Sequence, residues 1–99
     1  MKTNTTLTDK INRIVDLVCE EYFVTEEELR SKSRYKELVE ARQMAMYIIS
    51  RETGITLAEI GGVFDRDHAT VIYAIKKVRQ RAKHDQSVKF LITEITKEL

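Results

Sequence analysis

The sequence has few of the residues that interrupt regular structure. There is no proline and there are only three glycines in 99 residues, so polar residues supply most of the signals for turns and helix ends. Because proline and glycine are the strongest local breakers of helices, their scarcity favours a helical chain. The single cysteine, Cys19, excludes an internal disulfide, and it does not build a metal site with two distant histidines.

The sequence also lacks long apolar runs. No run approaches the ~20 residues that a membrane span needs, and the stretch Lys-Thr-Asn-Thr-Thr at residues 2–6 is not typical of a signal peptide. With a single cysteine, an intracellular, reducing location is expected. Apolar residues make up 42% and charged residues 33%, which is the balance of a soluble globular protein, and the length suits one domain with a single modest core.

Charge is unevenly distributed, although the net charge is only +1. Residues 16–28 hold six acidic side chains and no basic one, whereas residues 30–36 hold four basic side chains and no acidic one. Residues 66–83 hold six basic side chains against one acidic side chain. A protein of this kind can present one basic face to nucleic acid while its total charge stays near zero.

Apolar residues recur at helical spacing along most of the chain. Two Thr-x-x-Glu capping boxes, Thr25–Glu28 and Thr56–Glu59, predict helix starts, and Gly54 can adopt the left-handed conformation that ends a helix. No strand pattern competes with these signals. The sequence therefore predicts an all-α bundle of about six helices around one core, over residues 11–22, 25–29, 35–53, 56–64, 67–83 and 88–99.

The helices predicted at 56–64 and 67–83 are separated by only three or four residues, which is typical of a helix-turn-helix. On a helical wheel the second helix buries Val71, Ala74, Ile75 and Val78. Its other side carries the candidate DNA-facing residues Ala69, Tyr73, Lys76, Lys77 and Gln80. In a helix-turn-helix the N-terminal residues of the second helix contact base edges, and here these are His68, Ala69 and Thr70.

Each of these residues also has a simpler interpretation. Taken alone, His68 is typical of a capping or inter-helix hydrogen-bonding residue. Asp67 is expected to be an N-cap, because a carboxylate facing phosphate is repelled. The basic run at 76–83 alone is typical of a solvated helix end that the helix dipole favours. The tight turn and the second basic segment, 30–36, favour DNA binding over these interpretations.

Three segments resemble the C-terminal DNA-binding domain, domain IV, of the bacterial replication initiator DnaA. They are ARQMAMYIISR (Ala41–Arg51), LAEIGGVF (Leu57–Phe64) and RDHATVIYA (Arg66–Ala74), and their order and spacing match across residues 14–80. The resemblance implies a compact, single-domain, all-α fold of the Trp-repressor-like class containing a helix-turn-helix. It also implies recognition of a short, asymmetric, A/T-rich box in double-stranded DNA at replication origins and some promoters.

The resemblance also assigns roles to individual residues. The major-groove readers of the family fall on Asp67, His68, Ala69 and Thr70, and further DNA contacts fall on Arg66 and Lys77. The pair that holds the phosphate backbone falls on Arg42 and Gln43. The basic loop that reaches into the minor groove corresponds to Lys32, Arg34 and Lys36.

The chain departs from the family pattern at several of these positions. Ala69 replaces a threonine or serine, so it keeps a methyl contact with thymine but loses a hydrogen bond. Lys36 replaces the minor-groove arginine and lacks its planar fork. Glu37 and Glu40 place negative charge near predicted phosphate contacts, and Asp65 lies in a turn one residue shorter than the common Phe-Gly-Gly-Arg-Asp form.

The leading functional hypothesis is a sequence-preferring DNA-binding module in replication initiation or its regulation. We expect a monomer on a non-palindromic site, in the cytoplasm and associated with the nucleoid, with no cofactor and no membrane partner. The 99 residues contain no G-x-x-x-x-G-K-[ST] loop, so ATP-driven origin opening by this chain alone is excluded. An excised domain or a stand-alone relative is expected.

Two alternatives belong to other classes of protein. A protein-interaction module derived from this domain is favoured by Glu37, Glu40 and the acidic segment 16–28, which could dock a replication protein. An enzyme has little support, because Cys19 and His68 lie on separate predicted helices without a third group fixed beside them. The chain is therefore expected to have no hydrolase activity.

Overall fold

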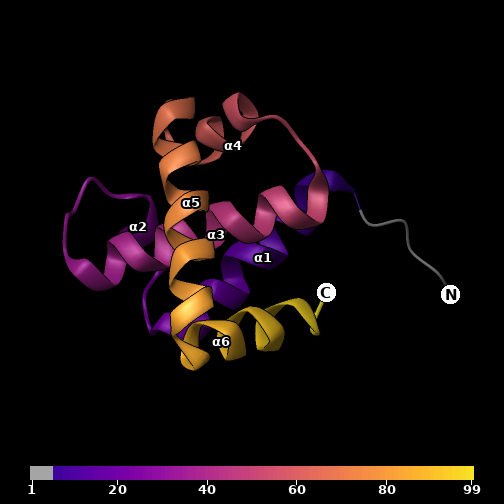
Figure 1. Cartoon of the computed structure of the whole chain (residues 1–99). Coiled ribbons are helices and arrows are strands. Elements are labelled where there is room, and N and C mark those ends of the chain that lie inside the picture. The colour runs from indigo at the N-terminus through magenta and orange to yellow at the C-terminus, as the bar shows by residue number, and fades with distance from the viewer. Residues whose placement is uncertain (1–5) are drawn as a thin grey trace, which may run out of the picture.

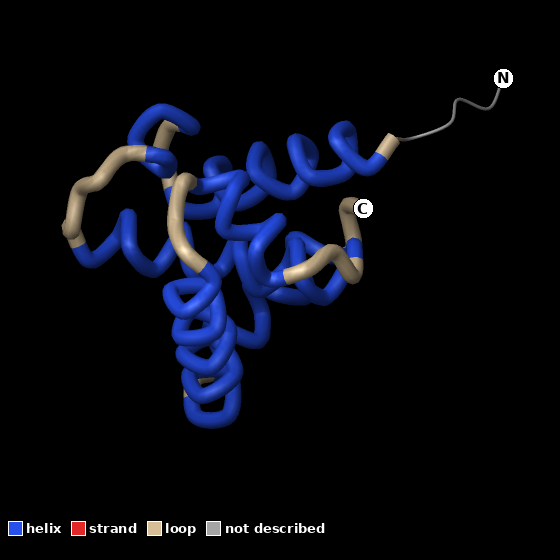
Figure 2. The backbone as a smooth tube through the Cα atoms, turned by 90° about the horizontal axis from the view of Figure 1, so that it is seen from above, coloured by secondary structure: helices blue, strands red, loops and turns tan. Residues whose placement is uncertain are grey.

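Residues 6–99 are described by a computed structural model, and they fold into six α-helices with no strand (Figures 1 and 2). The prediction of an all-α bundle is confirmed. Residues 2–5, on which most of the signal-peptide argument rests, lie outside the described residues. The helices are α1 (Leu7–Tyr22), α2 (Glu26–Arg30), α3 (Lys36–Thr53), α4 (Leu57–Phe64), α5 (His68–His84) and α6 (Gln86–Thr96).

The polar signals in the sequence mark the helix ends correctly. Both predicted capping boxes are present, with the hydroxyls of Thr25 and Thr56 each accepting a hydrogen bond from the backbone N–H three residues later. Gly54 ends α3 with φ 70°, in the left-handed region that glycine adopts without steric cost. A third capping box, Thr6 with Asp9, begins α1 and was not predicted.

Helix α3 lies at the centre of the bundle and contacts every other helix, with α5 crossing it in Figure 1. The sequence predicts one apolar stripe on this helix, with Met44 at its flank. In the structure nearly the whole middle of α3 is buried, including Met44 and Met46 at 2% and 1% exposure. The single-stripe prediction is therefore too narrow, because five helices surround α3 where a surface helix packs on one side.

Helices α4 and α5 form the predicted helix-turn-helix, joined by residues 65–67. The predicted inner face of α5 is confirmed, since Val71, Ala74, Ile75 and Val78 are all buried. In α4, Ile60 and Phe64 are fully buried, whereas Leu57 is only half-buried. Burial of these side chains fixes the direction in which the outer face of α5 points.

Candidate nucleic-acid interface

The turn between α4 and α5 is held close to α4 by its backbone. Asp65 has a left-handed conformation with φ 55°, and the N–H groups of Asp65 and Arg66 both donate to the carbonyl of Gly61. A Cβ atom on Gly61 would lie 2.2 Å from the carbonyl oxygen of Arg66. Gly61 is therefore the residue that lets the turn approach α4 this closely.

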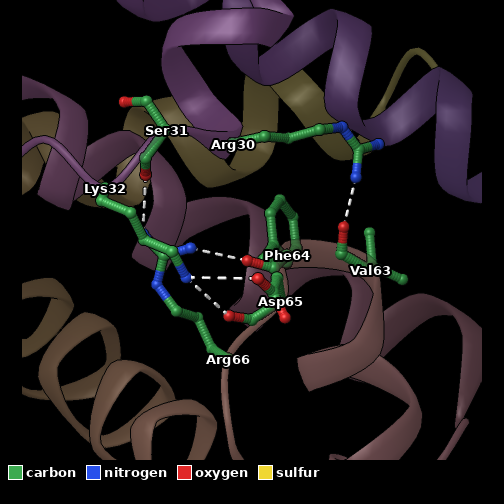
Figure 3. Close-up of polar contacts among 7 residues, drawn as sticks. All are labelled: Arg30, Ser31, Lys32, Val63, Phe64, Asp65 and Arg66. Carbon is green, nitrogen blue, oxygen red and sulfur yellow. Dashed lines mark hydrogen bonds and ion pairs between the residues drawn. The ribbon is translucent and has the colours of Figure 1, made fainter.

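Three cations, from the end of α2, the basic loop and the turn itself, donate hydrogen bonds to main-chain carbonyls around the turn (Figure 3). Arg30 donates to the carbonyl of Val63, and the ammonium of Lys32 lies 3.1 Å from the carbonyl oxygen of Asp65. The guanidinium of Arg66 donates to the carbonyls of Phe64 at 2.6 Å and Ser31 at 2.8 Å. Because the C-terminal end of a helix carries partial negative charge, these cations stabilise the end of α4 and join it to the loop.

The first turn of α5 is exposed beyond this turn. Asp67 is its N-cap, as predicted, because the carboxylate accepts hydrogen bonds from the backbone N–H of Thr70 at 2.9 Å and from its hydroxyl at 3.0 Å. These bonds lower the pKa of Asp67 below its ordinary value. The side chains of His68, Ala69 and Thr70 are all exposed, so this end of the helix is accessible to a partner.

Arg42 and Gln43, the predicted phosphate-binding pair, lie largely beneath the surface at 7% and 8% exposure. The guanidinium of Arg42 donates to the carbonyls of Leu29 at 2.6 Å and Ser33 at 3.3 Å, so it connects α3 to the basic loop. Burial and the nearby charge of Arg66 lower the pKa of Arg42. Sequence reasoning did not anticipate this internal role.

A small cavity of about 70 Å³ lies between α3 and the N-terminal half of α5. The predicted phosphate-binding pair and Thr70, one of the predicted base-contacting residues, both line it. Guanidinium, amide and hydroxyl groups around it can donate hydrogen bonds to an anionic oxygen. Its lining residues are Val39, Arg42, Gln43, Met46, Arg66, Thr70, Tyr73 and Ala74.

Most of the remaining predicted contacts are exposed, and only Lys77 is half-buried. Tyr73 is 57% exposed, and the ammonium of Lys77 lies 5.9 Å from its ring centroid. Lys76 is exposed one turn along α5. Arg34 and Lys36 are exposed at the end of the loop and the start of α3.

Sequence reasoning missed two arginines that hold these elements in place. Arg30 pairs with Glu26 at 2.9 Å within α2, and its guanidinium lies 5.7 Å from the ring centroid of Phe64. The i,i+4 spacing of Glu26 and Arg30 was a usable signal for the first contact. Arg81 contacts Gln43 and Glu40 on α3, and nothing in the linear sequence indicates that pairing.

Other kinds of site are not evident among residues 6–99. None of the helices in this part of the chain is long and apolar enough to cross a membrane. The same residues contain no group of three or more histidine, cysteine, aspartate or glutamate side chains placed to hold a metal ion.

The fold defines a helix-turn-helix protein. It has a short helix, a three-residue turn, and a longer helix whose first turn is exposed and flanked by cations. The chain belongs to the bacterial DnaA helix-turn-helix family. The family model described as "Bacterial dnaA protein helix-turn-helix" matches residues 11–78, which confirms the resemblance found in the sequence.

Individual relatives agree with this assignment. The chain is 43% identical over 90 residues to a chromosomal replication initiator protein DnaA from Thermodesulfovibrio yellowstonii, covering 90% of the chain and 20% of that protein. It is 42% identical over 80 residues to a DnaA protein from Thermus thermophilus, covering 80% and 18%. A crystal structure of a DNA replication initiation factor superposes with a TM-score of 0.80 at 36% identity, covering 93% of this chain and 30% of that one.

The chain spans about a fifth of the length of the curated relatives that it matches. The similarity therefore concerns the helix-turn-helix part of those proteins.

Proposed function

We propose that the chain binds double-stranded DNA through α4 and α5 and prefers a short, asymmetric, A/T-rich box of the DnaA type. The observation that carries this proposal is the exposed first turn of α5 beside the donor-lined cavity between α3 and α5. In this arrangement the groove and the adjacent phosphates would be contacted from one continuous surface. Origin binding in replication initiation, or competition for the same boxes, is the corresponding biological role.

Some residues of this surface would contact bases, and others would contact the DNA backbone. His68, Ala69 and Thr70 would face base edges in the major groove, since they are exposed at the N-terminal end of α5. Asp67 supports them as the N-cap. Lys76, Lys77 and Tyr73 would contact the backbone along the same side of α5.

The buried pair would act on phosphate from inside the cavity. Arg42 and Gln43 line it, and the donor atoms that make no internal hydrogen bond would be available to one phosphodiester oxygen. Lys32 and Arg66 would serve mainly to hold the turn, because each already donates to main-chain carbonyls. Arg34 and Lys36 remain the candidates for the minor groove, and their exposure agrees with that role.

Binding should be tested with a labelled duplex carrying a DnaA-type box and a scrambled duplex of the same composition. We expect tighter binding of the box at every salt concentration and a linear fall of log affinity with log salt. Equal affinity for the two duplexes would disprove sequence preference. No binding of either duplex at low salt would disprove the proposed function.

The same proposal includes a monomeric, non-catalytic protein. An asymmetric box offers one site to one helix-turn-helix, and no second copy is needed to read it. ATP hydrolysis is not expected, because these 99 residues contain no phosphate-binding loop. Sedimentation of the complex should give one protein per duplex, and a stoichiometry of two would contradict this part of the proposal.

A protein-docking role is the second candidate, favoured by the acidic side chains of α1 and α2. Asp16, Glu20, Glu21, Glu26, Glu27 and Glu28 are all exposed on elements outside the helix-turn-helix. A basic partner such as a replication protein could dock there. Capture of such a protein by wild-type chain that binds no duplex would favour docking over DNA recognition.

A further inference from the structure

Arg81 lies far from the proposed reading end of α5. It follows His68 by thirteen positions, which corresponds to roughly 20 Å along the helix axis at 1.5 Å per residue. Its side chain turns toward α3, where Nη1 lies 2.8 Å from Oε1 of Gln43 and Nη2 lies 3.8 Å from Oε2 of Glu40. Both charged side chains of this pair are 31% exposed, so the contact is shielded from solvent more than a surface ion pair is.

The contact with Arg81 fixes which way the amide of Gln43 points. A guanidinium has only donors, so it selects the amide oxygen and leaves the NH2 group on the other side. Gln43 is 8% exposed and lines the cavity between α3 and α5. Among residues 6–99, no protein group accepts a hydrogen bond from this NH2 group.

Glu40 completes the arrangement from one turn earlier on α3. Its carboxylate attracts the guanidinium toward α3 and so helps to hold it against Gln43. The acidic residue that departs from the family pattern is therefore paired within the fold. Arg81 thus links the charge of Glu40 to the orientation of Gln43.

We propose that Arg81 is a positioning residue for DNA binding, which holds the amide of Gln43 so that its NH2 group faces a phosphodiester oxygen. Arg81 itself does not touch the DNA. A phosphate oxygen only accepts hydrogen bonds, so a reversed amide would place oxygen against oxygen and lose the contact. The inference rests on the proposed DNA-binding function.

Arg81→Met removes the donors and keeps most of the side-chain volume, and Arg79→Met is the charge-matched control on the exposed side of α5. For the duplex carrying a DnaA-type box, we expect Arg81→Met to weaken binding by about 3- to 10-fold more than Arg79→Met does. Arg81→Lys should restore most of the affinity, because it keeps the charge and a donor. Thermal unfolding of each variant should show that the fold is retained.

The coupling to Gln43 separates positioning from a general structural effect. If Arg81 acts through Gln43, the double variant Gln43→Ala/Arg81→Met binds no more weakly than Gln43→Ala alone. If the fold loss of affinity in the double variant equals the product of the losses in the two single variants, the inference is wrong. A salt slope that falls by about 0.9 in Arg81→Met beyond the change in Arg79→Met would also overturn it, because that result indicates a direct phosphate contact.

A spectroscopic measurement on the wild-type protein does not depend on any variant folding. Addition of the box duplex should shift the side-chain NH2 resonances of Gln43, and unchanged resonances in a formed complex would contradict the inference. If the wild-type chain binds no duplex, the proposed function fails and the inference fails with it. If it binds and the two substitutions are independent, only the inference fails.

Discussion

At the scale of single residues, the proposed surface separates side chains that read bases from side chains that hold the backbone. His68 and Thr70 are exposed on the first turn of α5, whereas Lys77 lies more than one turn further along and is partly covered by Tyr73. Base-edge contacts discriminate between sequences, and phosphate contacts do not. The two groups should therefore respond differently to substitution.

His68→Ala and Thr70→Ala should reduce the preference for the box over a scrambled duplex, by about 1–3 kcal/mol for each lost base contact. Lys77→Ala should weaken binding to both duplexes equally and reduce the salt slope by about 0.9. Fluorescence anisotropy at several salt concentrations measures both quantities. Lys89→Ala, on the exposed face of α6, is the control that removes one charge away from the surface. A change of preferred sequence in Lys77→Ala would show that the roles are assigned wrongly.

The two adjacent glycines of α4 give a second contrast at this scale. Gly61→Ala should destabilise the protein by about 1–3 kcal/mol, because the new methyl group would press on the turn carbonyl of Arg66. Gly62→Ala meets nothing within 4 Å and should stabilise the helix by about 1 kcal/mol. Urea unfolding measures both changes. A similar loss of stability in the two variants would mean that the turn is not tightly packed.

At the scale of elements, the N-cap of α5 makes the stability of the fold depend on pH. Hydrogen bonds from Thr70 lower the pKa of Asp67 in the folded state. This group therefore stabilises the fold above its unfolded pKa of about 3.9, and the contribution is lost as the pH falls through the lower folded value. Glu59 and Asp85, whose pKa values are lowered by similar cap hydrogen bonds, act in the same direction.

Asp67→Asn keeps an acceptor for the N–H of Thr70 but removes the titrating group. We expect nearly unchanged stability at pH 7 and a shallower loss of stability than in the wild type between about pH 5 and pH 2. Chemical denaturation across that range measures the difference. If the free energy of unfolding falls equally with pH in the two proteins, Asp67 does not contribute through its ionised form.

The elements also show what could be predicted from the sequence. Capping boxes and Gly54 predicted helix ends correctly because these signals act within four residues along the chain. The burial of Arg42 and Gln43 and the pairing of Arg81 with α3 could not be predicted, since each depends on helices distant in sequence. Helical periodicity identifies a buried face but not which polar residue finds a partner beneath the surface.

At the scale of the whole molecule, the acidic and basic segments occupy different elements, except that Arg30 of the basic segment ends α2. The acidic side chains belong to α1 and α2, whereas the proposed surface uses the loop at 31–35, the start of α3, and α5. A near-neutral total charge is thus compatible with a locally basic surface. Because these acidic side chains lie outside α4 and α5, the docking surface proposed on α1 and α2 would use other residues than the proposed DNA contacts.

The central position of α3 determines how quickly backbone amides exchange with solvent deuterium. Because α3 contacts every other helix, its middle amides should become accessible only when the whole protein unfolds. The five-residue helix α2 has far fewer neighbours and should exchange through local opening. Exchange measured residue by residue by NMR tests this ranking, and faster exchange in α3 than in α2 would contradict it.

Exchange along α5 should follow the same pattern of packing. Its middle is fixed by Val71, Ala74 and Val78 against the core, while its first turn is exposed and held chiefly by the cap of Asp67. The end proposed to enter the groove should therefore exchange faster than the middle of the same helix. It can adjust to a base sequence at small energetic cost while the rest of α5 keeps its direction.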